Sequence, residues 1–153
     1  MSSIKVDEAR KIILEKIEVQ GTEKVSINEA LGRILSEDIV ARRNNPPMDN
    51  SAMDGYALIA NDIKSATPEN PIKLEIIEDL AAGYSPEMTI QPGQAVRIMT
   101  GAPIPEGADA VIMQEDTERN GNCVQVKDKA EVRENIRDAG EDVREGETVI
   151  KKG

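Results

Sequence analysis

The chain has 153 residues, enough for one ordinary domain or two small lobes, and its 19 basic and 29 acidic side chains give a formal net charge of −10. This charge opposes binding to nucleic acid or to an anionic membrane surface. The sequence has no histidine and one cysteine, which excludes histidine-based catalysis, histidine metal ligation and an internal disulfide bond. With no apolar run long enough for a signal peptide or a membrane span, we expect neither nucleic acid nor a membrane as a partner, and a cytoplasmic location.

The N-terminal third predicts one helix followed by short elements. Apolar residues at helical spacing predict an amphipathic helix over 6–17, and we expect its apolar stripe to pack in the core. Residues 24–27 and 34–40 are expected to form short strands, and Asn28 to cap a helical turn that ends at Gly32. The stripe consists of Val6, Ala9, Ile13 and Ile17.

The remainder of the chain predicts mainly β-structure. The Asn120-Gly121 pair between two apolar runs is a strong hairpin signal. Arg97 interrupts an otherwise apolar strand. The predicted strands cover 55–60, 72–76, 95–99, 111–116 and 123–127.

The segment Pro46–Tyr56 holds two prolines, two carboxylates, an amide, a hydroxyl and a glycine within eleven residues. The prolines remove backbone donors and fix φ, so we expect a stiff loop of the kind that carries binding groups. Asn50 and Ser51 are expected to hydrogen-bond the loop's own backbone. Gly55 permits a sharp turn that leaves Asp54 at the mouth of a strand. The residues alone favour a functional carboxylate and an ordinary turn aspartate equally.

A second segment, Arg97–Gly107, ends a strand at Thr100 and Gly101 and continues into a turn stiffened by prolines. Successive N–H groups near Gly101 could face an anion, with the Thr100 hydroxyl beside them. The spacing matches no nucleotide-binding motif, and the residues alone favour a rigid loop at the strand exit.

A third segment, Asn135–Asp142, gathers one arginine and several carboxylates. Arg137 could pair with a carboxylate or a phosphate, and Glu141 and Asp142 could serve a metal or act as a base. Clusters of this kind are most often solvated polar turns, which is the reading that the residues alone favour.

The three segments together resemble the N-terminal region of the MoeA family, in order and in spacing. This family comprises the molybdopterin molybdenumtransferases and includes the E domain of gephyrin. The resemblance extends from the first helix to Gly153. The segments read PPMDNSAMDGYA at 46–57, RIMTGAPIPEGADAVIMQE at 97–115 and NIRDAGED at 135–142.

The resemblance implies an enzyme that inserts molybdenum from molybdate into adenylylated molybdopterin, with Mg²⁺ assisting the release of AMP. It implies a homodimer with its active-site cleft between subunits, and a molybdopterin adenylyltransferase-type protein as a possible partner. It also implies an α+β fold, mainly β with a few helices, in two intertwined lobes. The expected lobes are 1–45 with 140–153, and 46–139.

The resemblance also implies roles for individual residues, carried over by motif. The catalytic residues would be Asp54, Thr100 and Asp142. The substrate-binding residues would be Arg137, Asn50, Ser51 and Gly101. No metal ligand is expected in this chain, because Mg²⁺ would be held mainly by a domain that follows in family members.

Family members continue into an α/β molybdopterin-binding domain and a small C-terminal β-barrel, which this sequence lacks. We expect the chain to be a fragment that is inactive alone, because its substrates are anions and its own net charge is −10. A non-catalytic scaffold or dimerisation module of the gephyrin type is the alternative function. An acidic β domain that binds divalent cations weakly is a third.

Overall fold

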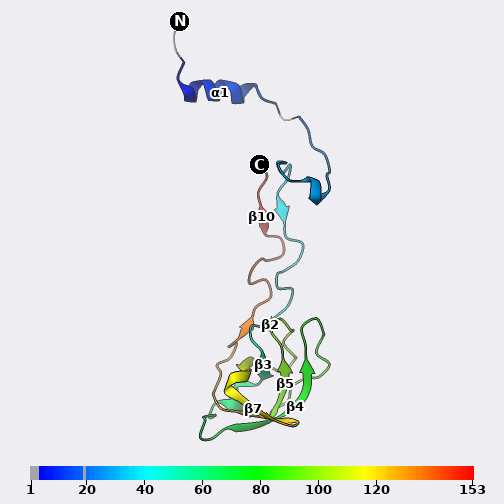
Figure 1. Ribbon diagram of the computed structural model, residues 1–153, viewed down its shortest axis with the longest axis vertical. Coiled ribbons are helices and arrows are strands. Elements are labelled where there is room, and N and C mark those ends of the chain that lie inside the picture. Colours follow the sequence, from blue (N-terminus) through cyan, green and yellow to red (C-terminus); the bar gives the residue numbers. More distant parts are fainter. Residues whose placement is uncertain (1–3, 19) are drawn as a thin grey trace. The chain divides into compact units, whose positions relative to one another are not determined.

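The computed structural model, drawn in Figure 1, describes residues 4–18 and 20–153. The chain divides into two units. One unit comprises Met1–Asp38 with Lys151–Gly153, and the other comprises Ile39–Ile150. The lobes expected at 1–45 with 140–153 and at 46–139 stay a prediction.

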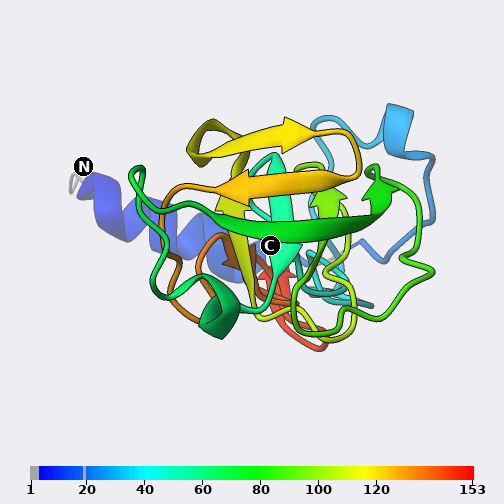
Figure 2. The ribbon, with the colours of Figure 1, turned by 90° about the horizontal axis from the view of Figure 1, so that it is seen from below.

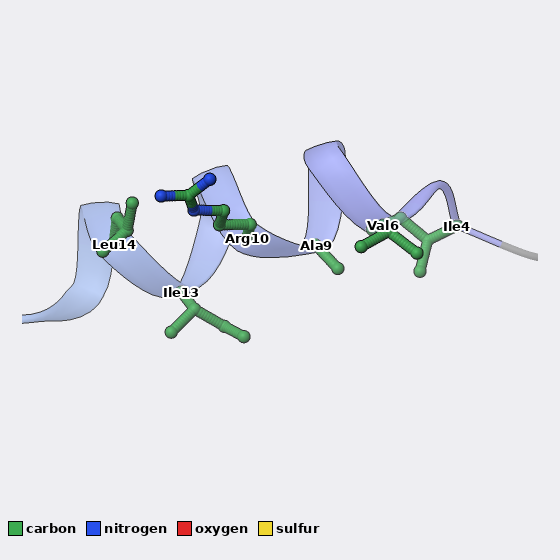
Figure 3. Close-up of a pocket in the computed structure, with 6 residues that line it drawn as sticks. All are labelled: Ile4, Val6, Ala9, Arg10, Ile13 and Leu14. Atoms are coloured by element: carbon green, nitrogen blue, oxygen red, sulfur yellow. The ribbon is translucent and has the colours of Figure 1, made fainter.

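The first unit contains the predicted amphipathic helix, α1, at Val6–Lys16. Asp7 and Glu8 in its first turn and Lys16 in its last turn complement the helix dipole. Figure 3 shows the apolar side chains along the helix, and no residue of α1 is buried. The prediction that this stripe packs in the core is therefore wrong: helical spacing specifies an apolar face, but burial needs a partner surface. Within the described residues, no helix is long and apolar enough to cross a membrane.

The segment after α1 is less regular than predicted. Residues 24–27 form no strand, and a short 3₁₀ helix, η1, occupies Ile27–Glu29. Ser26 rather than Asn28 caps it, because the Ser26 hydroxyl accepts the Asn28 N–H at 3.4 Å. Of the strand expected at 34–40, only β1 (Ile39–Val40) forms, and it pairs with β10 (Thr148–Ile150). An extended run becomes a strand only where another strand supplies hydrogen bonds.

The second unit is built on a six-stranded sheet in the order β6-β3-β5-β4-β8-β7. β4 and β5 run parallel, and the other neighbours run antiparallel. Figure 2 shows the hairpin of β7 and β8 lying beside the long green β4. The strands are β3 (Gly55–Leu58), β4 (Ile72–Leu80), β5 (Gln94–Ile98), β6 (Ala110–Met113), β7 (Thr117–Asn120) and β8 (Cys123–Val126).

Shorter elements complete this unit. β2 (Asn50–Ser51) and β9 (Ile136–Arg137) form a separate two-stranded ladder. The 3₁₀ helices η2 (Ala60–Ile63) and η3 (Gln114–Asp116) follow β3 and β6. The hairpin predicted at Asn120-Gly121 is confirmed, because Asn120 pairs with Cys123 across the turn.

The core lies on the two faces of the sheet, as strand alternation requires. Tyr56 and Leu58 belong to one buried cluster, while Ala57, Val96 and Ile98 belong to the other. Phenylalanine and tryptophan are absent, so aliphatic side chains make up most of the buried surface. Burial of a side chain such as Leu58, which is 0% exposed, contributes about 1.5–3 kcal/mol.

Candidate functional site

The short strand β2 brings the three predicted segments together. On one side it pairs with β9, which places Asn50 opposite Arg137. On the other side the Ser51 carbonyl accepts the Gly101 N–H at 2.8 Å, and the Ser51 N–H donates to the Ala102 carbonyl at 2.9 Å. Segments far apart in the sequence therefore meet around two residues of the proline-rich loop.

Asp54 and Thr100 form the central pair of the site. The Asp54 Oδ1 accepts the Thr100 N–H at 2.7 Å and the Thr100 hydroxyl at 2.8 Å. These bonds, the backbone one first, lower the pKa of Asp54 below its usual value because they stabilise the charged form. Within residues 4–18 and 20–153 we find no hydrogen bond to the Asp54 Oδ2. The arrangement holds an ionised carboxylate by one oxygen and leaves the other available.

Gly55 places Asp54 at the start of β3, but not through the sharp turn that we expected. Its φ is not positive, unlike that of Gly101 (φ 82°). Instead, a Cβ at Gly55 would lie 1.9 Å from the Ile112 carbonyl oxygen of β6. Glycine is needed here because two backbones approach too closely for any side chain.

The N–H groups near Gly101 bond groups of the chain itself, one of which is the anionic Asp54 carboxylate, and this fits the rigid loop that the residues alone favour. The Thr100 N–H donates to Asp54, the Gly101 N–H to Ser51 and the Ala102 N–H to the Met99 carbonyl at 3.0 Å. The turn is therefore closed by its own hydrogen bonds. Substrate contact by Thr100 or Gly101 stays a prediction.

The two polar residues of β2 differ in whether their side chains have hydrogen-bond partners. Ser51 is fully buried, and its hydroxyl donates to the Met53 carbonyl at 2.5 Å and accepts the Met53 N–H at 3.2 Å, which confirms the expected local bonding. The expectation is wrong for Asn50, whose buried Oδ1 has no hydrogen-bond partner in the described part of the chain. A buried polar atom left unpaired costs about 1–3 kcal/mol.

In the third segment Arg137 pairs with carboxylates of its own turn. It donates to the Asp142 Oδ1 at 2.8 Å and to the Glu141 Oε1 at 3.3 Å. These contacts, that of Asp142 first, raise the pKa of Arg137 above its usual value. Of the two partners considered from sequence, a carboxylate or a phosphate, the structure contains the first. The positive charge of Arg137 is thus balanced locally.

Asp49 is a site residue that the sequence analysis did not single out. Its Oδ1 accepts the Ala139 N–H at 2.8 Å, and its Oδ2 accepts from Arg133 at 2.8 Å. Arg133 also pairs with Asp138 and has a left-handed backbone, with φ 72°. Asp49 therefore ties the proline-rich loop to the third segment. No local signal distinguishes it from a turn aspartate, because its partners lie far along the chain.

Comparison with known proteins identifies the family. A family model described as the MoeA N-terminal region (domain I and II) matches residues 4–153. The chain belongs to this family.

Relatives of this MoeA N-terminal region are longer proteins. Molybdopterin molybdenumtransferase 2 of Mycobacterium tuberculosis (strain H37Rv, also named ATCC 25618) is 41% identical over 148 residues, which cover 97% of this chain and 36% of that protein. Molybdopterin molybdenumtransferase of Bacillus subtilis (strain 168) is 42% identical over 154 residues, covering 98% and 36%. The chain thus spans about a third of the length of these relatives, 36% in both cases.

A solved structure confirms the MoeA fold class. The crystal structure of the molybdopterin biosynthesis MoeA protein from Pyrococcus horikoshii OT3 matches with a TM-score of 0.90 and 44% sequence identity, covering 96% of this chain and 39% of that one. The mainly β fold predicted from the motifs is therefore confirmed, as is the family itself.

Proposed function

We propose that this MoeA N-terminal region forms one side of the active site of a molybdopterin molybdotransferase. The reaction is the insertion of molybdenum from molybdate into adenylylated molybdopterin, with release of AMP. The observation that carries the proposal is the Asp54 carboxylate, held ionised by Thr100 and open at its second oxygen. The names of the relatives support the substrate class. The rest of a longer protein would supply the other side of the site.

The residues around β2 would have different roles in this reaction. Asp54 would accept a proton or order a water molecule during molybdenum insertion, because its free oxygen is ionised and fixed in place. Thr100 would hold that carboxylate in position. Arg137, with its charge balanced by Asp142, would line the rim of the cleft. The unpaired Asn50 Oδ1 would accept a hydrogen bond from bound substrate or water.

The described residues do not offer a preformed Mg²⁺ site. Among them, no three Asp, Glu or Cys side chains gather as ligands of one metal ion. Mg²⁺ prefers several oxygen ligands, including substrate phosphates. We therefore assign no step to Mg²⁺ in this chain and propose that any such ion is bound mainly by residues outside it.

The assembly and location implied by the family also belong to this proposal. We propose a homodimer, with a molybdopterin adenylyltransferase-type protein as the source of the adenylylated substrate, in the cytoplasm. The exposed apolar side chains on α1 support association with another surface, since Ile13 is 60% and Leu14 58% exposed.

The test is Asp54→Asn in the full-length parent protein. We expect molybdoenzyme maturation at limiting molybdate to fall roughly 10²-fold or more, as for loss of a catalytic acid or base. Asp128→Asn is the charge-matched control, because Asp128 lies in an exposed loop and bonds only the N–H of its neighbour Lys129 among the hydrogen bonds that the described residues show. Undiminished maturation in Asp54→Asn would instead favour the scaffold function.

A further inference from the structure

Arg97 lies in an unusual place for an arginine, in the middle of the sheet. Its neighbours Val96 and Ile98 in β5 are fully buried in one core cluster. The Arg97 side chain projects to the opposite face, where it lies 5.4 Å from the centre of the Tyr56 ring. The salt bridges found among the described residues do not include Arg97. Its role is therefore not that of an ordinary surface charge.

The guanidinium instead donates to three uncharged acceptors. Nη1 donates to the Gly55 carbonyl at 2.9 Å and to the Ile98 carbonyl at 2.9 Å. Nη2 donates to the Gln114 Oε1 at 2.6 Å. A planar fork with several fixed donors can reach all of these groups at once, and a lysine ammonium cannot reproduce that geometry.

Each acceptor is next to the Asp54–Thr100 pair. Gly55 directly follows Asp54, and Ile98 lies two residues before Thr100. The N–H of Gln114, in turn, donates to the Asp54 carbonyl at 3.0 Å. The Thr100 N–H and hydroxyl complete the network, because both donate to the Asp54 carboxylate. A closed network thus joins the start of β3, the end of β5 and the start of η3 through one guanidinium.

We propose that Arg97 is a positioning residue of this site, whose guanidinium holds Asp54 and Thr100 in hydrogen-bonding register. Pairing of β3 with β5 ends at Gly55 and Ile98, so Asp54 and Thr100 lie just beyond the paired residues, where a further bridge between the two strands helps to hold them. The fixed fork of Arg97 supplies that bridge. Its positive charge acts in the same direction, because it adds to the lowering of the Asp54 pKa by the two Thr100 hydrogen bonds. The effect on catalysis rests on the function proposed above, whereas the positioning itself does not.

The positioning can be measured on the 153-residue chain by NMR. The Thr100 amide proton shifts as Asp54 ionises, because it donates directly to that carboxylate. In Arg97→Lys and Arg97→Gln we expect the amplitude of this shift to fall to roughly half or less, since hydrogen bonds weaken steeply with poorer geometry. Arg119→Gln is the matched control: it removes an arginine of the same sheet that makes two bonds to Asp79. This control should titrate like the wild type at Thr100.

A second variant keeps the test decisive if Arg97 variants fail to fold. Gln114 is exposed, and Gln114→Ala removes one Arg97 acceptor while leaving the Gln114 N–H bonded to Asp54. We expect a smaller loss of the Thr100 shift in the same direction. Full amplitude at Thr100 in folded Arg97→Lys, or in Gln114→Ala where that is the variant that folds, overturns the positioning role.

Turnover of the full-length parent protein separates the two proposals. We expect Arg97→Lys to lower kcat about 10- to 100-fold with little change in KM, as for a misplaced catalytic group. A reduced Thr100 shift combined with wild-type kcat would overturn the function proposed for the Asp54–Thr100 pair, and the positioning role would stand. A full Thr100 shift would overturn the positioning role whatever the turnover.

Discussion

Gly55 illustrates how a single residue decides whether the site can form. The backbones of β3 and β6 approach so closely that a Cβ at this position would lie 1.9 Å from the Ile112 oxygen. Because Asp54 precedes Gly55 and its carbonyl accepts the N–H of Gln114, the first residue of η3 after β6, any shift of β3 also moves the carboxylate. The absence of a side chain at Gly55 thus helps to fix where the Asp54 carboxylate lies.

We expect Gly55→Ala to destabilise the protein by about 2 kcal/mol or more, because the added methyl group meets backbone that cannot rotate away. Gly121→Ala is the control: Gly121 has a φ of 63° with open space around it, so only backbone strain of about 1 kcal/mol applies. Urea unfolding of both variants measures the difference. Equal destabilisation would show that the close approach of β3 and β6 is not rigid.

At the scale of elements, the two-residue strand β2 connects the segments that make up the candidate site. It bonds the strand exit at Gly101 on one side and β9 on the other, and Asp49 next to it bonds Ala139 and Arg133. A strand this short has little stability of its own. Its position therefore depends on side-chain contacts such as the Asp49–Arg133 pair.

The Asp49 contacts predict how stability depends on pH. The Ala139 N–H and then Arg133 lower the pKa of folded Asp49 below its unfolded value of about 3.9. A lowered carboxylate pKa gives stability that is present above the unfolded pKa and is lost as the pH falls through the folded pKa. We expect the free energy of unfolding to decrease on acidification below about pH 4, and less steeply in Asp49→Asn.

Urea unfolding between pH 7 and the acid range measures this dependence. Asp128→Asn serves as the charge control, since Asp128 bonds the N–H of the adjacent Lys129 rather than a distant segment. A slope in Asp49→Asn as steep as that of the wild type would mean that other carboxylates carry the acid sensitivity.

At the scale of the whole molecule, the two units differ in how they are stabilised. Among residues 4–18 and 20–153, the buried hydrophobic residues all lie between Tyr56 and Ala130, within the unit Ile39–Ile150. In the other unit no residue of α1 is buried, and Val6 is 85% exposed. For the part of the chain that the structure describes, hydrophobic burial, the main source of stability, therefore lies in the larger unit.

We expect a chain reduced to residues 39–150 to keep its thermal midpoint to within about 4 °C, because the removal costs less than about 1 kcal/mol of buried contacts. Calorimetry of the reduced and complete chains tests this. Circular dichroism of both chains checks that the sheet is intact before heating. A midpoint lower by 10 °C or more, on the order of 2 kcal/mol, would show that the removed residues, 1–38 and 151–153, stabilise the sheet.

Local signals in the sequence were sufficient for several features. Helical spacing placed α1, the Asn120-Gly121 pair placed the β7–β8 hairpin, and the three motifs identified the family. These features depend on residues close together in the chain, whose propensities act before any tertiary contact forms. The local hydrogen bonding of the Ser51 hydroxyl belongs here too, because its partner Met53 is two residues away.

Only the tertiary structure decided the features that depend on distant partners. Asp49 meets Arg133 across 84 residues, and Arg97 meets Gly55 across 42. The unpaired oxygen of Asn50 and the exposure of the α1 stripe likewise depend on what surrounds them. The amino-acid sequence by itself thus determined the family, the helix and the hairpin, and it predicts roles for Asp54 and Thr100 that stay predictions. The fold decided which groups hold that pair, because such contacts exist only once the chain has brought remote strands together.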